Sequence, residues 1–173
     1  VNTYMKMFTS RLRERFPDIF IVGEAASADV HLARTYSDPN EGGCNSVITF
    51  RYFPVDEESK DWRLNGNMQR APLLFDRFKE TMNEWQEEMS DIGGPTLYWN
   101  NHDMARAVSR FGDDHYFRRN SAKMLAVMLY LQKSLIVIMY GEEIGMKNLQ
   151  ITNLADIRSP EAKSFAKEAH LLG

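Results

Sequence analysis

The stretch that decides the fold of this 173-residue chain reads Thr96-Leu97-Tyr98-Trp99-Asn100-Asn101-His102-Asp103. A run of residues typical of a β-strand, 96–99, stops abruptly at two amides, an imidazole and a carboxylate. In barrels and open parallel sheets, ligands bind at the carboxyl edge, where the strands end. The stretch therefore predicts a strand that delivers polar side chains to a binding site at such an edge.

Helical and strand patterns alternate on both sides of this stretch. Short β-rich or continuous apolar runs predict strands at 19–22, 47–53, 96–99 and 135–139. Apolar residues at helical spacing predict helices at 2–16 and 74–89, and a weaker helix is expected at 29–36. Further helices are expected at 121–132 and at 160–172, the latter with Pro160 near its first turn and Gly173 after its end. The fourth of these helices is apolar on nearly every side and is expected to be buried, whereas the polar residues 54–70 are expected to form a long loop. The alternation predicts right-handed β/α units, and hence an α/β fold with a parallel sheet.

The composition is that of an ordinary globular protein, with 43% hydrophobic and 26% charged residues. A net charge of −3 gives no reason to expect nucleic acid or an anionic membrane as a partner. The most apolar tract, 124–140, is interrupted by polar residues at 132–134, and neither half approaches the ~20 residues of a membrane span. Cys44 is the only cysteine, which favours a reducing compartment, and no secretory signal is visible. We therefore expect a cytoplasmic protein without a membrane segment.

Metal and cofactor chemistry is not expected from the sequence. His31, His115 and His170 lie far apart, without the spacing of metal ligands, and a single cysteine adds little to them. The sequence also contains no glycine-rich loop of the kind that cradles a phosphate. We therefore expect neither a metal ion nor a cofactor.

Three segments resemble the α-amylase superfamily, glycoside hydrolase family 13. They are Val22-Gly23-Glu24, the block that begins at Asn100, and Tyr140-Gly141-Glu142-Glu143-Ile144-Gly145-Met146-Lys147-Asn148. The nearest group comprises the oligo-1,6-glucosidases, dextran glucosidases and trehalose-6-phosphate hydrolases. The resemblance implies that residues 1–173 are a partial catalytic domain, the C-terminal half (strands five to eight) of a (β/α)8 TIM barrel. It also implies retaining hydrolysis of short α-glucosides, with an oligosaccharide or disaccharide as the substrate.

The resemblance assigns roles to five residues at the ends of these strands. Glu24 matches the general acid/base, and Gly23 is expected to let the backbone turn tightly so that this carboxylate reaches the rim. Asp103 matches the carboxylate that stabilises the transition state, and His102 matches a donor to the sugar hydroxyls. Asn101 and Arg106 match residues of the substrate-binding rim. The tandem glutamates 142 and 143 are expected to support the barrel rim rather than to act as a catalytic pair.

Parts of the family pattern have no counterpart in residues 1–173. The nucleophile, an aspartate after strand four, is missing, and the chain opens in mid-helix, so we expect a fragment that is inactive alone. Such a half-barrel exposes two strand edges and is expected to self-associate through them. Residues 104–105 and 134–140 also depart from the family pattern. The alternatives are a trehalose-6-phosphate hydrolase, or a non-catalytic relative that serves binding or assembly.

Overall fold

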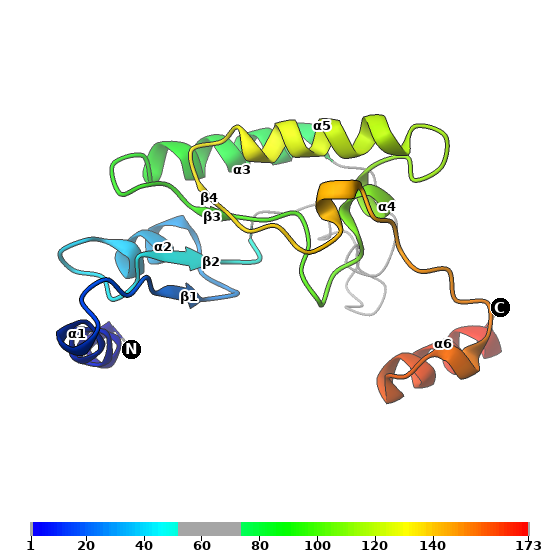
Figure 1. Cartoon of the computed structure of the whole chain (residues 1–173), viewed down its shortest axis with the longest axis horizontal. Coiled ribbons are helices and arrows are strands. Elements are labelled where there is room, and N and C mark those ends of the chain that lie inside the picture. The colour runs from blue at the N-terminus through cyan, green and yellow to red at the C-terminus, as the bar shows by residue number, and fades with distance from the viewer. Residues whose placement is uncertain (1, 52–73, 173) are drawn as a thin grey trace.

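The computed structural model describes residues 2–51 and 74–172 (Figure 1). The helices are α1 (Asn2–Arg15), α2 (Val30–Ser37), α3 (Phe75–Glu88), α4 (Ala107–Phe111), α5 (Arg118–Tyr130) and α6 (Pro160–Leu172). The strands are β1 (Val22–Glu24), β2 (Ser46–Ile48), β3 (Thr96–Leu97) and β4 (Leu135–Ile136), and two 3-10 turns cover Glu142–Ile144 and Leu154–Asp156. All five predicted helices and all four predicted strands are present, although the strands are shorter than predicted. The predicted loop at 54–70 and the end of the predicted strand 47–53 lie outside the described residues.

The strands form two parallel pairs that lie next to each other. β1 pairs with β2, with Glu24 opposite Ile48, and β3 pairs with β4, with Thr96 opposite Leu135. The hydroxyls of Ser46 and Thr96 share a buried hydrogen bond across the junction between β2 and β3. The strands therefore follow one another in chain order, as the predicted β/α units require.

The first strand begins later than predicted. Its predicted range is 19–22, but both backbone polar groups of Ile21 form hydrogen bonds with Asn45. The Asn45 Oδ1 accepts from the Ile21 N–H at 2.8 Å, and the Asn45 N–H donates to the Ile21 carbonyl at 2.7 Å. The ladder with β2 therefore starts only at Val22. Gly23 consequently lies within the strand, so its predicted role in a tight turn is wrong. A Cβ at Gly23 would approach the Cys44 Sγ to 2.8 Å, so close packing explains the glycine.

The core extends from α2 and β2 through β3 to the helices α3, α4 and α5, and α3 and α5 lie side by side along the β3–β4 pair (Figure 1). Trp99 is 1% exposed, stacks on Phe78 with ring centroids 5.5 Å apart, and donates its indole N–H to the Leu125 carbonyl at 2.7 Å. These contacts make Trp99 a packing residue of the core. Trp99 also connects β3 to both α3 and α5. Residues 100–106, which follow Trp99, are called the polar block below.

The predicted all-round burial of the helix at 121–132 is wrong. Only Leu125 and Leu129 of α5 are buried, whereas Met124 and Val127 are 47% and 58% exposed. The reason is that α5 packs on the core with one flank, while its other flank has no layer of described residues over it. Another difference is the short helix α4, which the sequence patterns did not predict and which contains the buried Arg110.

No helix within 2–51 or 74–172 combines the length and the apolar character needed to cross a membrane.

Candidate active site

The ends of β1, β2 and β3 meet at one edge of the sheet. Glu24 is the last residue of β1 and is exposed. The Tyr98 hydroxyl donates to the carbonyl of Thr49, the residue that follows β2, at 3.1 Å. Burial, and secondarily the nearby negative charge of Glu24, raise the pKa of Tyr98. The Glu24 carboxylate therefore lies within electrostatic reach of the segment that leads into the polar block.

Asn101, His102 and Asp103 form a tight turn, separated from the end of β3 by residues 98–100. The Asp103 N–H donates to the Asn101 Oδ1 at 2.9 Å, and the His102 Nε2 lies 3.4 Å from the Asp103 Oδ1. The side chains of His102 and Asp103 are 84% and 63% exposed. An imidazole and a carboxylate held together at an open rim can donate to and accept from the hydroxyls of a sugar.

Asn100 differs from these neighbours because it is buried. Its Nδ2 donates to the Glu142 Oε2 at 2.5 Å, and its Oδ1 accepts from the Ala107 N–H at 2.5 Å. The Tyr130 hydroxyl donates to the second carboxylate oxygen of Glu142. Burial raises the pKa of Glu142, opposed by the hydrogen bonds from Tyr130 and Asn100 and by the charge of Arg106. Glu142 therefore supports the rim, as predicted from the sequence.

Arg106 lies between the segments that follow β3 and β4. Its N–H donates to the Asn148 Oδ1 at 2.7 Å, its Nη1 donates to the Tyr140 carbonyl at 2.6 Å, and its guanidinium lies 4.8 Å from the centre of the Tyr140 ring. These contacts link residues that are 34 and 42 positions apart, and the sequence reasoning missed them. The only signal available was that all three residues lie in the two family-like blocks.

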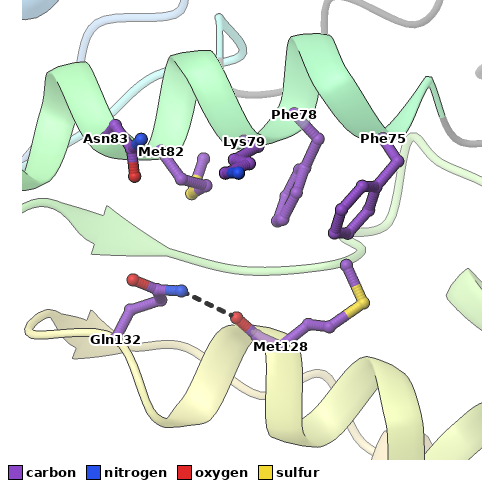
Figure 2. Close-up of a pocket in the computed structure, with 7 residues that line it drawn as sticks. All are labelled: Phe75, Phe78, Lys79, Met82, Asn83, Met128 and Gln132. Atoms are coloured by element: carbon purple, nitrogen blue, oxygen red, sulfur yellow. Dashed lines mark hydrogen bonds between the residues drawn. The ribbon is translucent and has the colours of Figure 1, made fainter.

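Two cavities lie at different places in the fold. An open cavity of about 580 Å³ is lined by Arg106, Tyr140 and residues 146–150, beside the polar block. A second, of about 250 Å³, lies between α3 and α5 and is mainly apolar (Figure 2). Its lining residues are Phe75, Phe78, Lys79, Met82, Asn83, Met128 and Gln132. The second cavity contains none of the predicted site residues.

Asn101, His102, Asp103 and Arg106 lie in one continuous segment of the chain, and Glu24 lies at the same edge of the sheet. Within residues 2–51 and 74–172, no group of three or more His, Cys, Asp or Glu side chains is arranged to hold a metal ion. The carboxylates, the imidazole, the amide and the guanidinium of these five residues can take part in acid–base catalysis and in hydrogen bonds to a polar ligand.

Known proteins resemble the chain over its whole length. The catalytic-domain model of the alpha-amylase family matches residues 1–171. The oligo-1,6-glucosidase of Halalkalibacterium halodurans is 34% identical over 173 residues, which is 100% of this chain and 30% of that protein. The trehalose-6-phosphate hydrolase of Bacillus subtilis is 35% identical over 147 residues, 84% of this chain and 25% of that protein.

The fold agrees with these similarities. The crystal structure of the Bacillus licheniformis trehalose-6-phosphate hydrolase superposes with a TM-score of 0.82 at 28% identity, over 99% of this chain and 30% of that structure. The chain thus spans less than a third of the length of the relatives that it matches, and corresponds to a portion of their TIM barrel. Because the family model matches nearly the whole chain, the predicted resemblance is confirmed: the chain belongs to the alpha-amylase family and represents part of its catalytic domain.

Proposed function

We propose that residues 1–173 form strands five to eight, the C-terminal half, of the (β/α)8 barrel of a retaining α-glucosidase. The proposed substrates are short α-glucosides of the kind named by the oligo-1,6-glucosidase relatives. The observation that carries the proposal is the placement of Glu24 and of the segment 101–103 at the carboxyl edge of parallel strands, where barrel enzymes hold their active sites. The proposed location is the cytoplasm.

Each residue has a proposed role in the two-step reaction. Glu24 protonates the glycosidic oxygen as the bond breaks, and then removes a proton from the incoming water. Asp103 stabilises the positive charge that develops on the sugar ring, and His102 donates to the hydroxyls of the same sugar. Asn101 and Arg106 hold the substrate at the rim. Glu24 and Asp103 are thus the proposed catalytic residues of this segment.

The nucleophile of the proposed enzyme comes from elsewhere in the barrel. A retaining glycosidase needs a second carboxylate about 5–5.5 Å from the acid/base, and the family resemblance assigns none of residues 1–173 to that role. Residues 1–173 by themselves are therefore proposed to be inactive. We use the term complete barrel for the full-length polypeptide that carries residues 1–173 together with the first half of the barrel.

Comparing the segment with the complete barrel tests this requirement. Purified residues 1–173 should not hydrolyse p-nitrophenyl α-glucoside, whereas the complete barrel should. Glucose release from isomaltose by residues 1–173 that disappears in the Glu24→Gln variant would show that the segment contains its own nucleophile.

The role of Glu24 has a separate test in the complete barrel. Glu24→Gln should lower kcat/KM for isomaltose about 10²–10⁴-fold, because the sugar leaving group needs a proton. The same variant should lower kcat/KM for p-nitrophenyl α-glucoside much less, since p-nitrophenolate leaves without protonation. The exposed Glu80→Gln on α3 is the matched control and should leave both values unchanged. Equal losses on the two substrates would rule out Glu24 as the acid.

A trehalose-6-phosphate hydrolase is the second candidate. It is favoured by the Bacillus relatives of that name and by the open cavity that carries two cationic side chains, Arg106 and Lys147. The ratio of kcat/KM for trehalose-6-phosphate and isomaltose separates the two hydrolases. A non-catalytic relative would bind one of these sugars in calorimetry and release no glucose.

We also propose that isolated residues 1–173 self-associate through their strand edges. In the described part of the chain β1 pairs only with β2 and β4 only with β3, so each has one free edge. Apolar side chains there are exposed, with Val22 at 41%, Val137 at 40% and Ile138 at 50%. Such edges favour pairing with another chain. Sedimentation should show a mass that rises with concentration, and a monomer at all concentrations would refute this.

A further inference from the structure

We propose that Glu142 is a positioning residue for the polar block after β3. The length of its side chain, rather than its charge, is what holds the block in place. The inference rests on the proposed function, because it concerns the segment that carries Asp103. Glu142 follows β4, whereas Asp103 follows β3, and Glu142 accepts a hydrogen bond from the buried amide of Asn100.

The backbone of Glu142 is held by a tight turn. Its N–H donates to the Met139 carbonyl at 3.0 Å, and its carbonyl accepts from the Gly145 N–H at 2.9 Å. Gly141 and Gly145, on either side of the turn, have φ of +85° and +63°, a region that glycine adopts without strain. A Cβ at Gly145 would lie 2.7 Å from the Ala122 Cβ, so the turn packs closely on α5. The carboxylate therefore projects from a fixed point.

Both carboxylate oxygens have donors from separate parts of the fold. Oε2 accepts from the Asn100 Nδ2 at 2.5 Å, at the end of the β3 segment, and Oε1 accepts from the Tyr130 hydroxyl, at the end of α5. Glu142 and Tyr130 also line a small enclosed space of about 20 Å³ beside Trp99. A space of this size holds roughly one water molecule. The Asn100 amide and the Tyr130 hydroxyl supply direct hydrogen bonds to the two oxygens of this half-buried carboxylate.

Asn100 transmits this position to the catalytic segment. Its other amide atom, Oδ1, accepts from the Ala107 N–H at 2.5 Å, and the site residues 101–106 lie between these two anchor points. The same segment is attached a second time, because the Asn148 Oδ1 accepts from the Arg106 N–H and the Asn148 N–H donates to the Ser109 Oγ. The turn after β4 thus holds the polar block from both ends.

Two substitutions of Glu142 in the complete barrel separate the effect of side-chain length from the effect of charge. Glu142→Gln keeps the length of the side chain: its oxygen accepts from Asn100, and its amide donates to the Tyr130 hydroxyl oxygen. Glu142→Asp keeps the charge but is one methylene shorter, so it cannot meet both donors. We expect Glu142→Gln to retain kcat within about twofold, and Glu142→Asp to lose up to about 100-fold in kcat with little change in KM, as for a misplaced catalytic group. Retained activity in Glu142→Asp with loss in Glu142→Gln would overturn the proposal, and so would equal kcat in both.

The control variant Asp103→Asn distinguishes a failure of this inference from a failure of the proposed function. If Asp103→Asn leaves kcat unchanged, the proposed function is wrong. If Asp103→Asn abolishes turnover while Glu142→Asp keeps the wild-type kcat, Asp103 is functional and Glu142 does not position it. Melting temperatures of all variants are measured together, and kcat is compared well below the lowest of them.

Discussion

Gly94 is the position at which a single methyl group should disturb the pairing of β3 with β4. Gly93 and Gly94 both have positive φ, +101° and +90°. A Cβ at Gly94 would lie 2.2 Å from the Lys133 carbonyl oxygen, whereas a Cβ at Gly93 would meet nothing within 4 Å. The adjacent residue Pro95 accepts from the Leu135 N–H at 2.9 Å, so the clash falls at the start of the ladder.

The two glycines form a matched pair for measuring the cost of this close approach. Gly93→Ala should lower the free energy of unfolding by about 1–2 kcal/mol, because only the left-handed backbone is strained. Gly94→Ala adds the displacement of backbone atoms, about 1–3 kcal/mol more, for a total of roughly 2–5 kcal/mol. Since ~1 kcal/mol shifts the melting temperature by ~2–4 °C in a domain of 150–250 residues, thermal denaturation resolves the difference.

The complete barrel is the protein for this assay, and the melting temperatures of the two variants are compared directly. Equal losses would mean that the chain at Gly94 does not run against the 133–134 backbone, and the packing argument for that glycine would fail. A larger loss at Gly93 would contradict the backbone geometry of the turn itself.

Two further predictions concern packing and pH. Leu129→Ala removes a side chain that is 0% exposed and should cost about 2–5 kcal/mol. Val127→Ala, on the same helix at 58% exposure, should stay within about 0.5 kcal/mol, and similar losses in thermal denaturation would contradict the observed orientation of α5. The Arg34 guanidinium, by hydrogen bonding, lowers the pKa of Asp91 to about 2, so this pair stabilises the fold above the ordinary pKa of 3.8 and loses that effect as the pH falls towards about 2. The stability advantage of the wild type over Arg34→Gln should therefore shrink across that range in urea titrations, and a constant difference would refute the coupling.

Local patterns were sufficient for most of the secondary structure. Helical spacing of apolar residues predicts α1 and α3 closely, because an amphipathic helix repeats its pattern every turn. The bounds of α6 follow from Pro160 and Gly173 in the sequence. The strands were harder, since their ends depend on partners: Asn45 takes the backbone groups of Ile21 and delays β1 until Val22. The role of Gly23 was misjudged for the same reason, because Cys44 is its neighbour only in space.

The sequence by itself determined the parallel α/β fold, the family and the residue types at the strand ends, because each is written in short contiguous motifs. Only the tertiary structure decided which side chains hold those motifs in place. Glu142 and Asn100 are 42 residues apart, and their contact exists because β3 and β4 are neighbours whose ends meet at one edge. Likewise, which flank of α5 is buried depends on what packs against it, and no pattern within the helix contains that information.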